Sequence, residues 1–315
     1  MKEPLKTETL TLNIKDFAEA FGTSEDEVSL FCGNLIRTLD FKYTICPQET
    51  REKIFLDVIT KCDHALFPVS GKHRKPDWRK GWGENLKDLF SSEDLGALIP
   101  KYWRGDRPLR YKGEYILASS DSFERDFGDV FKLWLYHKYF KDYDNIYDFG
   151  CGTGYDLANM AGKLPGKRFF GMDWAPESQG LLATIAEKYG WQMKGINFDL
   201  FRPDYKLEIL PNSLVYTSSS LEQLGVDHNS FTNYLLAKQP SLCVNMECLS
   251  EYYDKNNLFD FLALKYHKAR NYLDGFLTRL RGFEKEEKIK IIATKRTGFG
   301  SLYHEAYMYV IWKIL

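Results

Sequence analysis

Apolar residues recur along the chain with two different spacings, and the change between them falls near residue 123. Over residues 1–66 the spacing is mainly helical, with apolar positions three or four residues apart. Ser24 and Glu27 have the spacing of a capping box, which predicts the start of a second helix there. Residues 67–125 follow neither pattern, and we expect irregular loops. Residues 1–122 are therefore predicted to form a mainly helical amino-terminal extension.

From residue 123 onward, short apolar runs alternate with helical patterns. The predicted elements are a helix at 123–139, strands at 145–149, 168–173, 191–198, 213–217 and 242–246, a long helix at 257–283, and strands at 288–294 and 306–313. Such alternation predicts a doubly wound parallel sheet flanked by helices. No helix separates the last two strands, so the last strand is expected to be antiparallel. We therefore predict a seven-stranded, Rossmann-like α/β domain over residues 123–315.

A glycine-rich turn follows the first strand of this predicted sheet. Gly150, Gly152 and Gly154 alternate there, so the backbone can turn sharply and approach a ligand without Cβ atoms in the way. A dinucleotide fingerprint requires G-x-G-x-x-G, whereas Tyr155 occupies the position of its third glycine. Asp148 ends the strand, and a carboxylate there would repel a pyrophosphate. The turn therefore indicates a cationic ligand rather than a dinucleotide.

Acids also end the next two predicted strands. They are Asp173 and Asp199, and the carboxyl ends of parallel strands meet at the edge of the sheet where ligands bind. A carboxylate at Asp173 can accept hydrogen bonds from both hydroxyls of a ribose. Trp174 and Phe198 stand beside these acids, and each can cover one face of a planar ring. We therefore expect one ligand to span the three strand ends.

The acid-x-G-x-G-x-G turn, together with acids at the following strand ends, resembles class I methyltransferases that use S-adenosylmethionine (SAM). The resemblance covers about residues 125–315 and implies a SAM-dependent enzyme that releases S-adenosylhomocysteine. It implies that Asp148 helps to hold the methionine end, that Asp173 binds the ribose and that Asp199 binds the adenine amino group. The expected SAM-site residues are Asp148, Gly150, Cys151, Gly152, Gly154, Asp173, Trp174, Phe198, Asp199 and Ser218.

The carboxyl half is similar to sugar O-methyltransferases of polysaccharide and secondary-metabolite clusters, in its segments 219–224, 266–270 and 296–305. This similarity implies a hydroxyl acceptor, which needs a general base. His304 is the first candidate because it lies just before the last strand, and Glu305 beside it could orient the ring; a histidine bonded within the hairpin is the alternative. The other candidates for the base are His267, Glu247 and Glu222. The expected acceptor-binding residues are Tyr102, Arg104, Glu222, Arg270 and Arg296.

Two segments mix cations with aromatic rings, at residues 72–82 and 101–107. They could serve the acceptor, hold bases and phosphates, or form solvated loops whose tryptophans pack on the main domain. An RNA methyltransferase is therefore one alternative, and a non-catalytic SAM-binding protein is another. The net charge of -1 gives no electrostatic argument for nucleic acid. Residues 217–220 also lack the Pro-Pro-aromatic motif of base N-methyltransferases, so a small-molecule acceptor is expected.

The composition agrees with a folded enzyme. Hydrophobic residues make up 44% and aromatic residues 16% of the chain, which allows a large core and excludes a disordered chain. The beginning of the chain lacks an apolar signal core, and no apolar run approaches a membrane span, so we expect a cytoplasmic protein. Its six cysteines show no zinc spacing and are expected to be reduced. No metal site is predicted, and the metal requirement and a homodimer are left open.

Overall fold

The structure, a computed structural model, describes residues 8–103 and 105–315 and contains the predicted seven-stranded sheet. Its order is β10-β12-β9-β8-β5-β6-β7. The five parallel strands are β5 (Asn145–Phe149), β6 (Arg168–Asp173), β7 (Met193–Asn197), β8 (Ser213–Ser218) and β9 (Leu242–Glu247). The strand β12 (Met308–Ile314) lies between β9 and β10 (Ile289–Lys295) and is antiparallel to both. The prediction of a doubly wound sheet with an antiparallel last strand is therefore confirmed.

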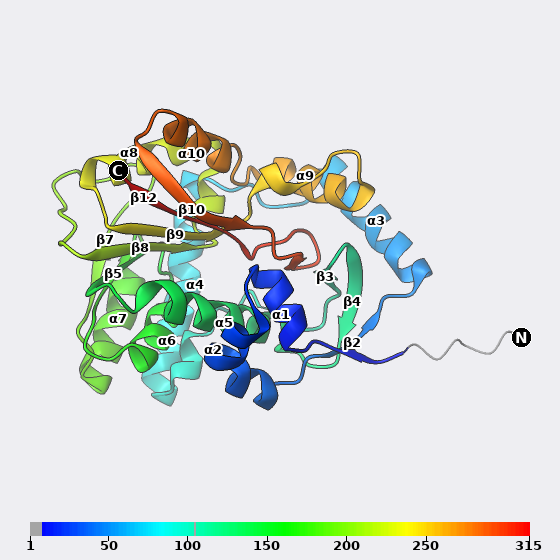
Figure 1. Cartoon of the computed structure of the whole chain (residues 1–315), viewed down its shortest axis with the longest axis horizontal. Helices are drawn as coiled ribbons and strands as arrows, with labels where there is room; N and C mark the ends of the chain where they lie inside the picture. Colours follow the sequence, from blue (N-terminus) through cyan, green and yellow to red (C-terminus); the bar gives the residue numbers. More distant parts are fainter. Residues whose placement is uncertain (1–7, 104) are drawn as a thin grey trace, which may run out of the picture.

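Helices cover both faces of this sheet (Figure 1). One face carries α5 (Phe123–Leu135), α6 (Tyr155–Lys163) and α7 (Pro176–Tyr189). The other face carries α8 (Asn229–Lys238) and α10 (Phe276–Lys285). Because both faces are covered, the central strands β5 and β9 are buried at every position.

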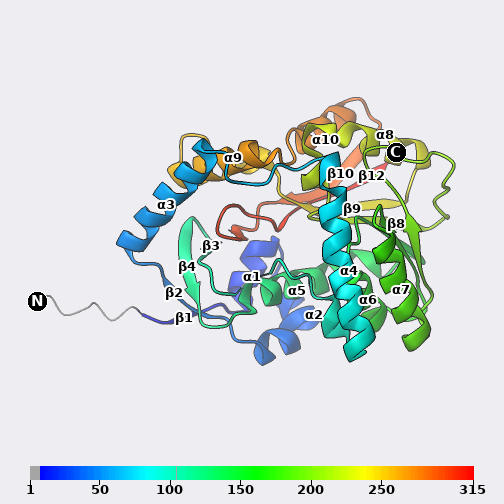
Figure 2. The same ribbon diagram turned by 180° about the vertical axis from the view of Figure 1, so that it is seen from behind.

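The described part of the amino-terminal extension contains four α-helices. They are α1 (Ile14–Phe21), α2 (Glu25–Thr38), α3 (Gln48–Asp63) and α4 (Lys75–Ser92). The prediction of irregular loops over residues 67–125 is wrong, because α4 and two strands lie there. Only Trp82, Asn85 and Leu89 of α4 are buried, which is too narrow an apolar stripe to reveal a helix in the sequence. The helix α4 packs against α7, beside the sheet (Figure 2).

A second sheet joins the extension to the carboxyl-terminal hairpin. Its order is β1-β2-β4-β3-β11. The strands are β1 (Leu10–Thr11), β2 (Lys42–Ile45), β3 (Leu109–Tyr111), β4 (Glu114–Ala118) and β11 (Phe299–Gly300). Since β11 belongs to the connection between β10 and β12, its antiparallel pairing with β3 fixes that connection against the extension. The connection also carries His304, so the extension helps to position this part of the hairpin.

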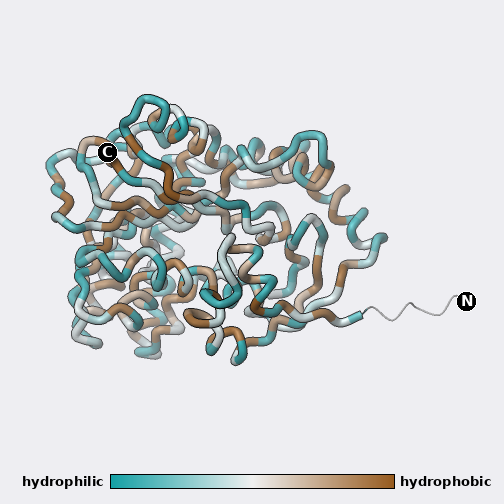
Figure 3. The backbone as a smooth tube through the Cα atoms, viewed as in Figure 1, coloured by the Kyte–Doolittle hydropathy of each residue, from teal (hydrophilic) through white to brown (hydrophobic). Residues whose placement is uncertain are grey.

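Buried apolar side chains form one large cluster on each face of the main sheet. The first contains Phe127 and Phe131 of α5 and extends to Phe17 and Phe21 of α1. The ring centroids of Phe21 and Phe131 are 4.9 Å apart, so the extension shares its core with the sheet. The second cluster lies under α8 and α10. The inner strands carry much of the hydrophobic colour, while teal segments lie mainly at the periphery (Figure 3).

The long helix predicted at 257–283 is instead two helices. The first, α9 (Leu258–Arg270), is capped by Asn271, which has a left-handed φ of 52°. Gly275, with φ of 77°, then precedes α10. The turn between them brings Tyr272 into the wall of the main cavity, so the interruption contributes directly to the site.

Candidate active site

A cavity of about 700 Å³ lies at the carboxyl edge of the main sheet. The chain places β6 and β7 on one side of β5 and β8 and β9 on the other, so the strand order reverses between β5 and β8. Ligands of doubly wound sheets bind outside the strand ends at this reversal, and the volume is within the usual range for ligand sites. The walls combine the loops after the strands with the extension and the carboxyl-terminal hairpin.

The glycine turn after β5 has no room for side chains. A Cβ atom on Gly150 would lie 2.3 Å from that of Ser220, and one on Gly152 would lie 3.0 Å from the Trp82 ring. Both glycines have positive φ, at 85° and 55°. The N–H of Gly152 donates to one carboxylate oxygen of Asp173 at 3.0 Å, which ties the turn to the end of β6. The backbone of the turn is therefore the surface that a ligand meets.

Asp173 keeps capacity for further hydrogen bonds. Its second carboxylate oxygen accepts from the N–H of Ala175 at 2.8 Å. Each carboxylate oxygen can accept two hydrogen bonds, so one acceptor position stays free on each. Burial raises the pKa of Asp173 to about 6, although these N–H donors oppose the shift. The carboxylate lines the cavity, as the sequence predicted for a ribose site.

Buried acids surround the end of β5. Asp148 lines the cavity, and burial, with Asp156 as the next cause, raises the pKa of Asp148 well above its usual value. Lys132 of α5 is buried too, and its Nζ lies 2.7 Å from Asp156 and 3.8 Å from Asp129. One ammonium group therefore faces three carboxyl groups, and a cationic ligand would restore the balance of charge.

Of the residues predicted to bind adenine, two line the cavity and one does not belong to its described wall. Trp174 and Phe198 line the cavity next to the ends of β6 and β7. Asp199 is not among the described residues of the cavity wall, and its carboxylate accepts from the N–H of Phe201 at 2.9 Å. Its side chain therefore stabilises its own turn.

The other predicted SAM residues are also placed differently from one another. Gly150, Cys151, Gly152 and Ser218 line the cavity. Gly154 is not part of the described wall; it precedes α6 with φ of 78°, and a Cβ there would lie 2.4 Å from Leu182. Glycine is therefore needed at position 154 because Leu182 of α7 packs against this turn.

The predicted acceptor residues come together only in part. Tyr102, Glu222 and Arg270 all line the cavity. Burial raises the pKa of Glu222 to about 7, and Arg270 opposes that shift. Arg104 lies outside the described residues. Arg296 is engaged elsewhere, in ion pairs with two carboxylates of the hairpin and α9, Glu305 at 2.7 Å and Asp260 at 2.5 Å.

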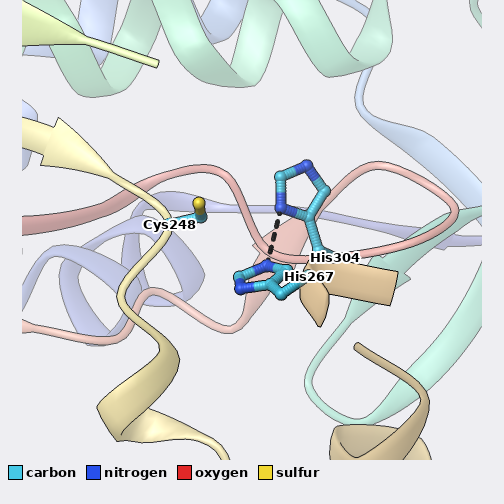
Figure 4. Close-up of side chains that lie close together, drawn as sticks. All are labelled: Cys248, His267 and His304. Carbon is cyan, nitrogen blue, oxygen red and sulfur yellow. Dashed lines mark hydrogen bonds between the residues drawn. The ribbon is translucent and has the colours of Figure 1, made fainter. Parts of the chain in front are cut away.

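The three predicted catalytic residues have different surroundings. His304 lines the cavity, whereas His267 is not among the described residues of the cavity wall. The Nδ1 atom of His304 lies 3.1 Å from Nε2 of His267 (Figure 4). Burial lowers the pKa of His267 to about 3 and that of His304 well below its usual value. Glu305 does not orient His304, because its carboxylate binds Arg296. Both imidazoles are therefore poor proton acceptors at neutral pH.

Glu247 has a structural partner for each of its oxygens. Its carboxyl group accepts backbone N–H bonds from Ser220, Leu221 and Glu222 at 3.1–3.3 Å. It is fully buried, and burial raises its pKa to about 8. It is not among the described residues of the cavity wall. Glu247 therefore holds the loop after β8 in place, and Glu222 on that loop is the carboxyl group that reaches the cavity.

The basic-aromatic segment at 72–82 forms part of the cavity wall rather than an open loop. Trp78 and Trp82 stack with ring centroids 5.3 Å apart, and Trp82 covers the glycine turn. Arg74 pairs with Asp77 in the same segment. Arg79 forms an ion pair with Glu177 of α7 at 2.9 Å. These carboxylates neutralise the positive charge of Arg74 and Arg79, which would otherwise attract nucleic acid.

Several cavity residues were not predicted from the sequence. Lys132 could have been found, because a cation between Phe131 and Leu133 interrupts the buried face of a helix. Tyr303 and Tyr307 gave no such signal, since only the return of the hairpin brings them to the cavity.

No protein-family model and no curated protein matches this chain. Solved structures do match it. An rRNA methylase from Escherichia coli is 13% identical with a TM-score of 0.44, over 96% of this chain and 100% of that one. Human N-acetylserotonin methyltransferase, in complex with SAM, is 12% identical with a TM-score of 0.39, over 76% and 65%. The small RNA methyltransferase HEN1 is 14% identical with a TM-score of 0.42, over 57% of this chain and 24% of that one.

These likenesses concern the fold, so the function is argued from the cavity. Within the described residues, no helix combines the length and the apolar character that crossing a membrane requires.

Proposed function

We propose that the protein is a SAM-dependent methyltransferase. The observation that carries the proposal is the pair of buried carboxyl groups Asp148 and Asp173, at the ends of adjacent parallel strands around a glycine turn, in the wall of one cavity. SAM carries positive charge on its sulfur and amino groups against a single carboxylate. A site with excess buried acid favours such a ligand over a pyrophosphate.

The residues present fit each part of SAM. Asp148 would face the ammonium group, and the two free acceptor positions of Asp173 would take the ribose hydroxyls. Trp174 and Phe198 would contact the adenine ring. SAM, when bound, supplies an electrophilic methyl group on a sulfonium. The Asp199 side chain is not needed for this arrangement.

We infer that the acceptor is a hydroxyl group of a small molecule, either a sugar or a sugar-bearing metabolite. Support comes from the region of the cavity beyond the SAM residues, where Tyr266 and Tyr303 stack with ring centroids 4.9 Å apart beside Glu222 and Arg270. Aromatic faces suit the apolar face of a sugar ring, and charged side chains suit its hydroxyls. The paired state of Arg74 and Arg79 further supports a small acceptor over RNA.

Glu222 is the best placed general base for this transfer. It follows Ser218–Ser220 closely in the chain, and these serines, Glu222, the glycine turn and Tyr266 all line the same cavity. Ser219 holds a left-handed φ of 51°, an unfavourable conformation for a serine that redirects the chain there. Glu222 would take the hydroxyl proton while the oxygen bonds to the methyl carbon and sulfur keeps the electrons of the broken C–S bond. Alignment of the two reactants would supply most of the acceleration.

The ribose contact predicts a difference between two strand-end acids. Asp173→Ala should weaken SAM binding by about 1.5–3 kcal/mol, the range for hydrogen bonds to a charged group. Asp199→Ala is the matched control, since Asp199 ends the next strand outside the described cavity wall, and it should leave the affinity nearly unchanged. Calorimetry on both folded variants measures this. Equal losses of affinity would contradict the proposed ribose site.

The pKa of Asp173 predicts the pH dependence of SAM binding. Ribose hydroxyls donate to the ionised carboxylate and therefore favour that form, so affinity should be highest above the free-protein pKa of about 6 and fall below it. The limit is about tenfold per pH unit. Asp148 and Lys75 also act on this region, so the Asp173→Asn variant serves as the reference. A wild-type affinity profile that parallels that of Asp173→Asn would refute the assignment.

A further inference from the structure

Three buried side chains from distant parts of the chain converge behind the cavity. Cys248 directly follows β9, His267 lies on α9, and His304 lies in the connection that leads to β12 (Figure 4). Each offers one ligand atom, and these atoms all lie within 4.8 Å of one another. The two imidazole planes lie at 76° to each other, and a hydrogen bond of 3.1 Å joins Nε2 of His267 and Nδ1 of His304.

We propose that Cys248, His267 and His304 bind one Zn²⁺ ion at the wall of the acceptor region. Thiolate and imidazole are the ligands that zinc prefers, whereas Mg²⁺ and Ca²⁺ take oxygen ligands. Zn–N bonds of about 2.0–2.1 Å at tetrahedral angles place two nitrogen ligands about 3.3 Å apart. The observed 3.1 Å is close to that separation, so the two rings need little movement to share an ion.

The surroundings provide a counter-charge for the ion. A divalent ion with one thiolate and two neutral imidazoles retains one positive charge. The buried carboxyl group of Glu222, which lines the same cavity as His304, can offset this charge. The nearby guanidinium of Arg110 is held by the carbonyls of Tyr303 and Phe259. A carboxylate near the ligands is the kind of second contact that strengthens metal sites.

The position of the ion links it to the transfer reaction, and this role rests on the proposed function. His304 is a ligand and also lines the cavity, while Cys248 and His267 lie behind it. Three protein ligands leave a fourth position open, as in catalytic zinc sites. An acceptor hydroxyl bound there would become more acidic. Its proton would pass to Glu222 as the oxygen bonds to the methyl carbon and the C–S electron pair stays on sulfur.

Metal binding can be measured without any acceptor. The full chain is treated with a chelator and then titrated with Zn²⁺, and separately with Co²⁺, whose absorption reports thiolate ligation. We expect one ion per chain, a sulfur-to-cobalt charge-transfer band, and a higher melting temperature with Zn²⁺ than without it. Mg²⁺ should not compete. A folded wild-type chain that binds neither ion stoichiometrically would overturn the proposal.

Variants identify the ligands. Cys248→Ser should abolish the charge-transfer band, and His304→Gln should weaken Zn²⁺ binding about 100-fold or more, since even the outer contacts of metal sites are worth about 10- to 100-fold. Cys62→Ser is the control, because Cys62 is a free, partly exposed cysteine that should bind nothing specifically. A charge-transfer band that survives Cys248→Ser, or that is lost in Cys62→Ser, would overturn the site. If SAM binds and no metal does, only the metal proposal fails. If the metal binds and SAM does not, the metal site stands and the proposed methyltransferase function fails.

Discussion

Glu222→Gln is expected to reduce methyl transfer about 100- to 10,000-fold, the usual contribution of a general base. The amide keeps the shape of the side chain but cannot accept the hydroxyl proton. Because Glu222 is not among the residues proposed to hold SAM, the affinity for SAM should change little. Single-turnover rates on sugar-like acceptors, with calorimetry for SAM, separate these two effects.

Glu124→Gln is the matched control for this experiment. Glu124 lines the same cavity, is partly buried, and its pKa is also raised by burial to about 7. It lies on α5, away from the loop after β8, so its replacement should cost less than tenfold in rate, below the range of a general base. A larger loss in Glu124→Gln than in Glu222→Gln would move the base to the other side of the cavity.

Lys132→Met should lower the free energy of unfolding by about 3–5 kcal/mol, the range for breaking a buried ion pair from one side. The Lys132 side chain is 3% exposed and its partner Asp156 11% exposed. Removal of the ammonium leaves buried carboxyl groups without a counter-charge, while methionine fills much of the space. Chemical denaturation in the absence of SAM measures the effect.

Lys138, which follows α5 in the chain, provides the comparison for the free energy of unfolding. Lys138 pairs with Glu27 at 2.8 Å, but both side chains are about 30% exposed. Water screens such a pair, so Lys138→Met should cost less than about 1 kcal/mol. Similar losses for Lys132→Met and Lys138→Met would mean that the buried pair does not stabilise this part of the fold.

The fold, and the strand-end acids and glycine turn to which we assign SAM, could be predicted from the sequence because they depend on local features. Asp148 and Asp173 are the penultimate and last residues of apolar strands, and parallel strands bring their carboxyl ends to one edge. The glycine turn needs small residues at fixed positions. Asp199 shows the limit of this reasoning, since a strand-end acid can equally bond its own turn.

The acceptor end depends on contacts between distant segments, which no local pattern reveals. The ligand set of Cys248, His267 and His304 has no recognisable spacing, because it draws on β9, α9 and the last hairpin. His304 was expected to be the base from its position alone. Its burial beside His267 decides its chemistry instead, and Glu222, expected to bind the acceptor, takes the role of base in our proposal.

The helix α4 illustrates the same limit in the extension. Its tryptophans and cations were expected in loops, with tryptophans packed on the main domain as one alternative, whereas they lie on a helix from which Trp82 covers the glycine turn and Arg79 binds α7. Those contacts stabilise a helix whose own sequence, with two glycines, has a low helical propensity.

Binding of SAM to the wild-type chain tests the central claim most directly. We expect calorimetric titration to give one site per chain, and prior addition of S-adenosylhomocysteine to abolish the heat of SAM binding. A correctly folded chain that binds SAM at no site, or that binds it undisturbed by S-adenosylhomocysteine, would contradict the account.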